Sequence, residues 1–106
     1  VASLLKFQTA VRVPWVCYIA AATINAANVL GLKADMLVTS GNDKVHMKKS
    51  KHYSDMALDF RTKHLQPKDK QALRTEVKRR LGKDFDAILE DEGGNGEHLH
   101  VEYDPK

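Results

Sequence analysis

Two short segments of the chain contain the residues best suited to metal chemistry. The first, in the middle of the chain, contains His52 and Asp59, and the second, near the C-terminus, contains Glu97 and His100. Two imidazoles, one carboxylate and an open position suit a catalytic zinc, whereas a structural zinc is more often closed by four protein ligands. His52, Asp59 and His100 are therefore candidate zinc ligands, with Glu97 as an additional carboxylate.

The spacing within the second segment constrains how its side chains can meet. His98 and His100 are two residues apart on a predicted strand, so their side chains should leave the same face of a sheet. Glu97 and His100 are three apart, which places them on opposite faces of a regular strand. A shared site therefore needs a bend at the start of this strand. Three glycines make such a bend plausible: Gly93, Gly94 and Gly96.

Length and composition indicate one globular domain, residues 1–106. Hydrophobic residues make up 42% and charged residues 29%, which is ordinary for a soluble chain. The formal charge of +3 favours an anionic partner, such as a cell-wall polymer or nucleic acid, without choosing between them. The single cysteine excludes both an intrachain disulfide and a zinc site built from several thiolates.

The apolar stretch from Trp15 to Leu32 raises the question of a membrane span. Polar residues interrupt it at Thr23, Asn25 and Asn28, whereas a span needs about 20 apolar residues in a row. A buried helix is the better interpretation, and no membrane span is expected. No signal peptide is visible, and the localisation is left open.

The first part of the chain predicts a helix followed by two strands. Helical spacing of apolar residues runs from Trp15 to Leu30, and Gly31 is a plausible helix end. We expect a short buried strand over residues 35–39, and the polar residues 40–50 predict an exposed loop. Residues 56–60 resemble a second strand.

The second part predicts a helix and a hairpin. The helix covers residues 68–81, with Gly82 as its stop. Strands over 85–90 and 98–103 flank a glycine-rich turn at 91–96, which favours an antiparallel hairpin. The expected fold class is α+β, a small antiparallel sheet with helices packed on it.

Taken together, the two segments resemble the motifs of the zinc D-alanyl-D-alanine carboxypeptidase and L-alanyl-D-glutamate endopeptidase family, whose fold is shared with the hedgehog signalling domain. The family's first motif is Ser-x-His-x-x-Gly-x-Ala-x-Asp. Its second motif is Glu-x-x-His, with a further histidine two residues before the ligand. The matching residues, in chain order, are Ser50, His52, Ala57 and Asp59, then Glu97, His98 and His100.

The resemblance extends over residues 15–103, with two departures. Thr39-Ser40-Gly41 is similar to the family's entry to the substrate loop, but the arginine that often follows is absent. Three residues are candidates for the missing positive group: Lys44, His46 and Arg61. Asp55 replaces the motif glycine, and aspartate is among the few residues that tolerate positive φ.

The resemblance implies a role for each matched residue. His52, Asp59 and His100 would bind Zn²⁺. Glu97 would be the general base that takes a proton from the attacking water and passes it to the leaving amine. His98 would sit beside the metal and help stabilise the tetrahedral intermediate. On the substrate side, Ser50 would orient substrate or a ligand, with a turn-closing hydroxyl as the alternative. His46 would contact substrate or would simply be solvated.

The resemblance therefore implies a single-domain zinc peptidase, hedgehog/DD-peptidase-like in fold, that hydrolyses a peptide bond in bacterial peptidoglycan stem peptides. Carboxypeptidase and endopeptidase action remain open, as does the oligomeric state. The small size suggests a phage lysis or tail enzyme acting on the host cell wall, or a domain of a bacterial enzyme. The alternative is a non-catalytic, zinc-containing cell-wall binding module on the same fold. A nucleic-acid partner is not expected, because no base-reading motif accompanies the +3 charge.

Overall fold

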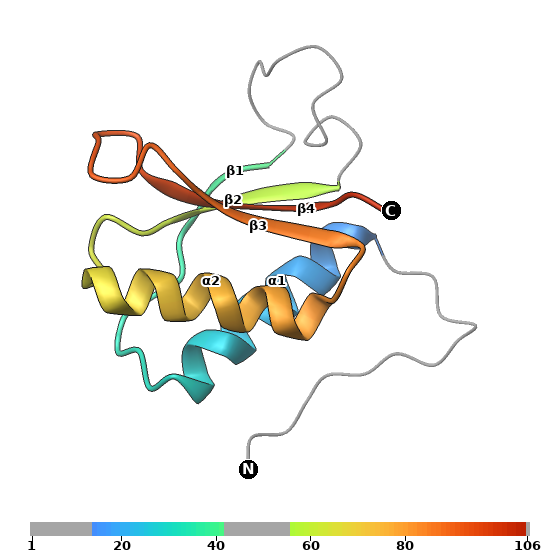
Figure 1. Cartoon of the computed structure of the whole chain (residues 1–106), viewed down its shortest axis with the longest axis horizontal. Helices are drawn as coiled ribbons and strands as arrows, with labels where there is room; N and C mark the ends of the chain where they lie inside the picture. The colour runs from blue at the N-terminus through green and yellow to red at the C-terminus, as the bar shows by residue number, and fades with distance from the viewer. Residues whose placement is uncertain (1–13, 42–55, 106) are drawn as a thin grey trace.

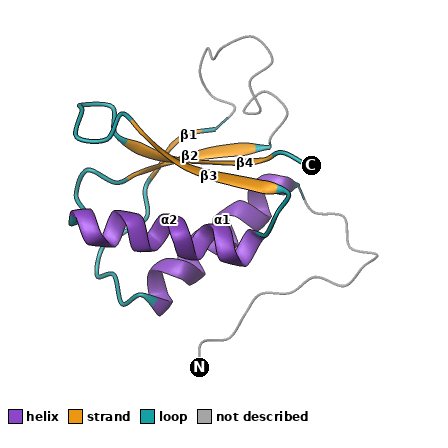
Figure 2. Cartoon of the chain, viewed as in Figure 1, coloured by secondary structure: helices purple, strands orange, loops and turns teal. Residues whose placement is uncertain are grey.

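The computed structural model describes residues 14–41 and 56–105 (Figure 1). The elements, in chain order, are α1 (Trp15–Val29), β1 (Val38–Ser40), β2 (Ala57–Arg61), α2 (Pro67–Leu81), β3 (Phe85–Glu90) and β4 (His98–Tyr103). The four strands form one antiparallel sheet in the order β1-β2-β4-β3. Both helices lie on the same side of this sheet (Figure 2). The predicted α+β class with a small antiparallel sheet is confirmed.

Proline and glycine set the ends of both helices. Pro14 is the N-cap of α1, and Pro67 occupies the first turn of α2, where a missing N–H costs nothing. After α1, Gly31 has a φ of 71°, and after α2, Gly82 has a φ of 89°. A left-handed residue of this kind ends a helix at little steric cost only when it is glycine. The predicted stops at Gly31 and Gly82 are confirmed.

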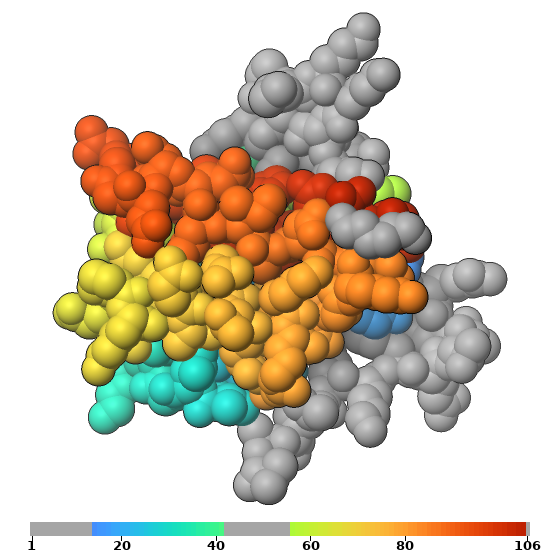
Figure 3. All heavy atoms as spheres, viewed as in Figure 1, coloured from blue at the N-terminus to red at the C-terminus, as the bar shows by residue number. Residues whose placement is uncertain are grey.

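The hydrophobic core lies between the helices and the inner face of the sheet. Leu73 and Val77 of α2 are fully buried, and so is Ile19 of α1. They pack with Leu99 and Val101 of β4 in one cluster, and burial of each such side chain is worth about 1.5–3 kcal/mol. In the space-filling view, side chains of α2 and β3 form a continuous surface over this core (Figure 3).

The helix α1 is a packed helix of the domain. Its buried residues include Ile19, Ala26 and Ala27, which join the core cluster. Within residues 14–41 and 56–105, neither helix is both long enough and apolar enough to cross a membrane.

The first strand differs from its prediction. A buried strand was expected over residues 35–39, but β1 covers Val38–Ser40. It lies at an edge of the sheet and pairs only with β2, with a register shift between Val38 and Ser40. Leu37 and Val38 are about half exposed, at 52% and 45%. The apolar run predicted burial, but an edge strand has a neighbour on one side only, so its side chains stay partly in solvent.

Candidate metal centre

The outer face of the sheet, opposite the helices, gathers the titratable side chains of three neighbouring strands. β4 lies between β2 and β3. Across the β2–β4 pair, Asp59 is opposite His100 and Arg61 is opposite His98. Across the β3–β4 pair, Glu90 is opposite His98. Strand register alone therefore brings residues from distant parts of the sequence into one patch.

Alternation along β4 explains why its polar residues share that face. Leu99 and Val101 are fully buried in the core, whereas His98, His100 and Glu102 are only partly buried. Successive side chains on a strand point to opposite faces, so these three polar residues leave the sheet together. The prediction that His98 and His100 leave the same face is confirmed.

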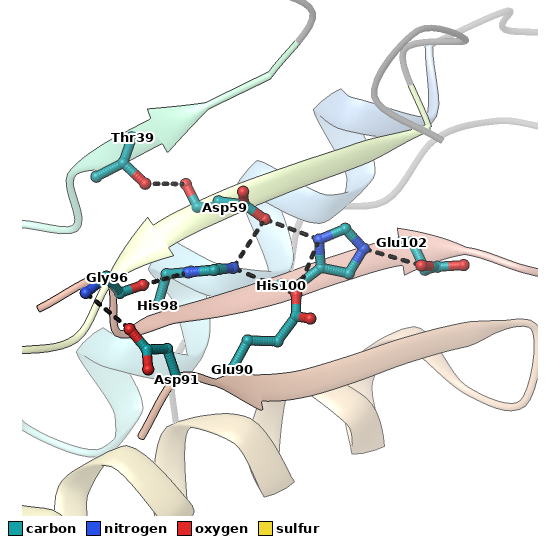
Figure 4. A network of polar contacts seen from close by, with 8 residues as sticks. All are labelled: Thr39, Asp59, Glu90, Asp91, Gly96, His98, His100 and Glu102. Carbon is teal, nitrogen blue, oxygen red and sulfur yellow. Dashed lines mark hydrogen bonds and ion pairs between the residues drawn. The ribbon is translucent and has the colours of Figure 1, made fainter. Parts of the chain in front are cut away.

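Four side-chain atoms converge at the centre of this patch (Figure 4). Asp59 Oδ1 lies 2.8 Å from His100 Nδ1 and 3.8 Å from His98 Nε2. Glu90 Oε1 lies 3.2 Å from His98 Nε2 and 3.7 Å from His100 Nδ1. Asp59, Glu90 and His98 each offer a ligand atom, all within 4.8 Å of one another. This cluster of carboxylates and imidazoles has the donor chemistry to hold a metal ion.

The other nitrogen of each imidazole has its own oxygen partner. His98 Nδ1 lies 2.7 Å from the carbonyl oxygen of Gly96. His100 Nε2 lies 2.8 Å from Oε1 of Glu102. The turn before β4 holds Gly96 in place, because the Gly96 N–H donates a hydrogen bond of 2.9 Å to the Asp91 carboxylate. Both rings are thus fixed in orientation by groups outside the central cluster.

The surrounding carboxylates change the protonation of His100. Burial by itself lowers the pKa of this imidazole, but hydrogen bonds to Asp59 and Glu102 and the charges of Asp59 and Glu90 outweigh it. The pKa of His100 is raised to about 9. Without a metal, His100 is therefore an imidazolium at neutral pH, paired with the carboxylates around it.

The cluster runs from a buried wall to a solvent-exposed rim. The side chains of Asp59 and His100 are each 13% exposed, and that of His98 is 25% exposed. The Glu90 side chain is 48% exposed. Asp59 and His100 are thus held by the sheet, whereas Glu90 forms the rim.

A cleft of about 440 Å³ opens beside His98. Its lining comes from β1, from β2 and the segment that follows it, and from the turn before β4 with the first residue of β4: Thr39, Ser40, Asp59, Arg61, Lys63, Asn95, Gly96, Glu97 and His98. The Thr39 hydroxyl also donates to the backbone carbonyl of Asp59, at 3.5 Å. Arg61 and Lys63 are exposed and give this cleft two cationic side chains.

The Glu97 carboxylate is held in an ion pair. The Lys70 ammonium on α2 lies 2.7 Å from Oε1, the Thr62 hydroxyl donates to Oε2 at 2.6 Å, and the Gly93 N–H donates to Oε1 at 3.0 Å. Glu97 is only 4% exposed. Hydrogen bonds from Lys70, then Thr62 and Gly93, lower the pKa of Glu97 to about 2. The general-base role of Glu97 stays a prediction, and this geometry gives the same residue a structural role.

Among the residues that the structure describes, several members of the predicted site lie together. Asp59 and His100, two predicted ligands, are in contact, with His98 beside them, and Arg61 lines the neighbouring cleft. Four other predicted residues lie outside the described residues: Lys44, His46, Ser50 and His52.

Two carboxylates that contact the site histidines were missed by reasoning from the sequence. Glu102 follows His100 by two residues, so strand alternation could have placed both on one face. Glu90 could be found only through the hairpin register, in which it pairs with His98. The sequence predicted which segments form strands, but it did not predict which residues of β3 and β4 pair with each other.

Comparison of the chain with protein-family models, with curated proteins and with solved structures finds no match.

Proposed function

We propose that the protein is a zinc-dependent peptidase that hydrolyses a peptide bond in bacterial peptidoglycan stem peptides, on a hedgehog/DD-peptidase-like fold. One observation carries the proposal. Asp59 and His100, which occupy ligand positions of two separate motifs, meet at 2.8 Å across β2 and β4. A metal site built from both motifs would require this convergence of their ligand residues on one face of the sheet.

The donor set fits zinc. Zinc is bound in proteins by imidazole nitrogens, carboxylate oxygens and thiolates. This chain has one cysteine, so its zinc ligands would be mainly imidazoles and carboxylates. Asp59 and His100 would hold the ion, and the resemblance adds His52 as a third ligand. Zinc in such a site supplies Lewis-acid chemistry, polarising a carbonyl and lowering the pKa of a water molecule.

Proton transfer to the leaving amine is the step that needs a carboxylate. The resemblance assigns it to Glu97, but Glu97 would have to leave its ion pair with Lys70 to accept a proton. A group with a pKa of about 2 is also a weak acceptor at neutral pH.

The cleft beside the cluster suits an anionic peptide. Stem peptides carry free carboxylates, and Arg61 and Lys63 lie on the cleft wall that also contains His98. Arginine binds a carboxylate in a bidentate manner. We assign Arg61 to the substrate carboxylate. Ser50, Lys44 and His46 remain proposed substrate contacts.

The test is digestion of purified peptidoglycan with the zinc-loaded protein, followed by identification of new peptide termini by mass spectrometry. New termini within stem peptides, lost in Asp59→Asn and kept in His64→Ala, are the expected result. His64 is an exposed histidine that serves as the matched control. An active Asp59→Asn variant with no zinc would remove the basis of the proposal.

The base is tested with Glu97→Gln at the same zinc occupancy as wild type. Loss of a general base lowers the rate by about 10²–10⁴-fold. A Glu97→Gln rate within about threefold of wild type would leave Glu97 with its structural role alone.

A non-catalytic cell-wall binding module on the same fold is the second candidate. The observation in its favour is that Glu97, the carboxylate expected to be catalytic, is buried in an ion pair with Lys70. This candidate predicts that the zinc-loaded protein sediments with peptidoglycan and produces no new termini.

A further inference from the structure

Each histidine of β4 has one ring nitrogen that is hydrogen-bonded to an oxygen outside the cluster. The Gly96 carbonyl can only accept a hydrogen bond, so His98 Nδ1, 2.7 Å away, must be the donor. His100 has a carboxylate 2.8 Å from each ring nitrogen, Glu102 at Nε2 and Asp59 at Nδ1, so either nitrogen can carry its proton. In the neutral His98 ring the lone pair therefore lies on Nε2, and a neutral His100 ring with its proton on Nε2 has its lone pair on Nδ1.

Those two nitrogens face carboxylate oxygens. His98 Nε2 lies 3.2 Å from Glu90 Oε1 and 3.8 Å from Asp59 Oδ1. His100 Nδ1 lies 2.8 Å from Asp59 Oδ1 and 3.7 Å from Glu90 Oε1. Lone pairs of two imidazoles that point at two carboxylates require a cation among them, either a proton or a metal ion.

The spacing of these atoms is close to that of a coordination shell. Donors held 2.0–2.2 Å from a tetrahedral metal lie about 3.3–3.6 Å from one another. The histidine–carboxylate separations given above range from 2.8 to 3.8 Å, and the ligand atoms of Asp59, Glu90 and His98 all lie within 4.8 Å of one another. Histidine ligands usually donate their second N–H to a carbonyl or a carboxylate, which fixes the ring. Gly96 and Glu102 are partners of these two kinds.

We infer that Glu90 and His98 are themselves metal ligands, and that with Asp59 and His100 they supply four donors for a divalent transition metal on β2, β3 and β4. This site differs from the one implied by the motif resemblance, in which His98 only neighbours the metal and His52 completes the ligand set. Four protein donors complete a tetrahedral shell, as in a structural zinc site, so the inference concerns metal binding and, where it holds, favours the non-catalytic candidate over the peptidase.

Titration of Zn²⁺ into the metal-free full-length chain by isothermal calorimetry tests the ligand set. Loss of a ligand should weaken affinity at least as much as loss of an outer partner, about 10–100-fold. Glu90→Gln and His98→Ala should therefore bind at least about tenfold more weakly, and His52→Ala should bind within about threefold of wild type. The Glu90 side chain is half exposed, so Glu90→Gln should leave the core intact.

Matched controls come from neighbouring exposed residues. Glu92→Gln and His64→Ala remove the same chemical groups outside the cluster and should bind Zn²⁺ like wild type. The visible spectrum of the Co²⁺-loaded protein gives a second measurement, since a change in donor number alters its intensity in Glu90→Gln even if His98→Ala fails to fold. Wild-type affinity and an unchanged Co²⁺ spectrum in Glu90→Gln, with loss of metal in His52→Ala, would overturn the inference. So would a wild-type chain that binds no metal.

Discussion

Lys70 of α2 lies 2.7 Å from Glu97, the residue immediately before β4, so an ion pair joins the second helix to the strand that carries both site histidines. The Lys70 side chain is 12% exposed and that of Glu97 1%. A charge in such an environment is tolerated only while its partner is present. This pair therefore fixes where β4 begins and, through it, where His98 stands.

Lys70→Met should destabilise the fold because it leaves the buried Glu97 carboxylate without its cation. Removal of one partner from a buried pair costs about 3–5 kcal/mol. We expect the free energy of unfolding in urea to fall by about 3 kcal/mol. Lys68→Met, an exposed position on the same helix, is the control. Adding Glu97→Gln should restore part of the loss, and a single-variant effect below about 0.5 kcal/mol would contradict the structural role.

Acid should remove the stabilising effect of Glu97 over a defined pH range. Its pKa is about 2 in the folded chain and about 4.5 as a free side chain. A lowered folded pKa stabilises the protein fully above the unfolded value, and the contribution is lost as pH falls from about 4.5 toward 2. Wild type should therefore be more stable than Glu97→Gln at pH 6, with a smaller difference at pH 3. A difference that is the same at both pH values would show that this carboxylate does not titrate as stated.

The raised pKa of His100 predicts proton release on metal binding. Metal ligation requires a neutral imidazole, and the pKa of His100 is about 9 in the metal-free chain. Zinc binding at pH 7.5 should release about one proton from this residue. Calorimetry in buffers of different ionisation enthalpy measures that number. Glu102→Gln removes one hydrogen bond that raises the pKa, so fewer protons should be released.

The raised pKa of His100 also determines whether the metal-free protein gains or loses stability as the pH rises. A histidine whose folded pKa is raised from 6.5 to about 9 stabilises the protein fully below pH 6.5. That contribution is lost as pH rises through about 9. Metal-free wild type should therefore lose stability between pH 6.5 and 9 relative to His100→Gln, and equal pH profiles for the two proteins would contradict the assignment.

Local signals in the sequence predicted most elements correctly, because helix ends and turns are set by single residues. Gly31 and Gly82 end the helices, and the glycine-rich turn forms the expected hairpin. The strand predicted at residues 35–39 exists, but its predicted bounds and burial were wrong, since an apolar run does not reveal whether a strand lies at the sheet edge. Glu90 and the Lys70–Glu97 pair could not be found from sequence spacing, because each depends on how separate elements meet.

The turn between β3 and β4 should control metal affinity without touching the metal. A Cβ on Gly94 would lie 2.3 Å from Oδ1 of Asp91, whose Oδ2 accepts the hydrogen bond from Gly96. Gly94→Ala must therefore displace the Asp91 carboxylate and loosen the Gly96 carbonyl that orients His98.

We expect Gly94→Ala to weaken Zn²⁺ binding by about tenfold, the effect of losing an outer partner of a ligand. Its unfolding free energy should fall by about 1 kcal/mol. Asp91→Ala should reproduce both effects, because it removes the same hydrogen bond to Gly96. Glu92→Ala, on the exposed neighbour of Asp91, should change neither. Calorimetric titration with Zn²⁺ and urea unfolding measure the two quantities. If both turn variants have a lower free energy of unfolding but bind Zn²⁺ as tightly as wild type, the Gly96 carbonyl does not position His98 for the metal.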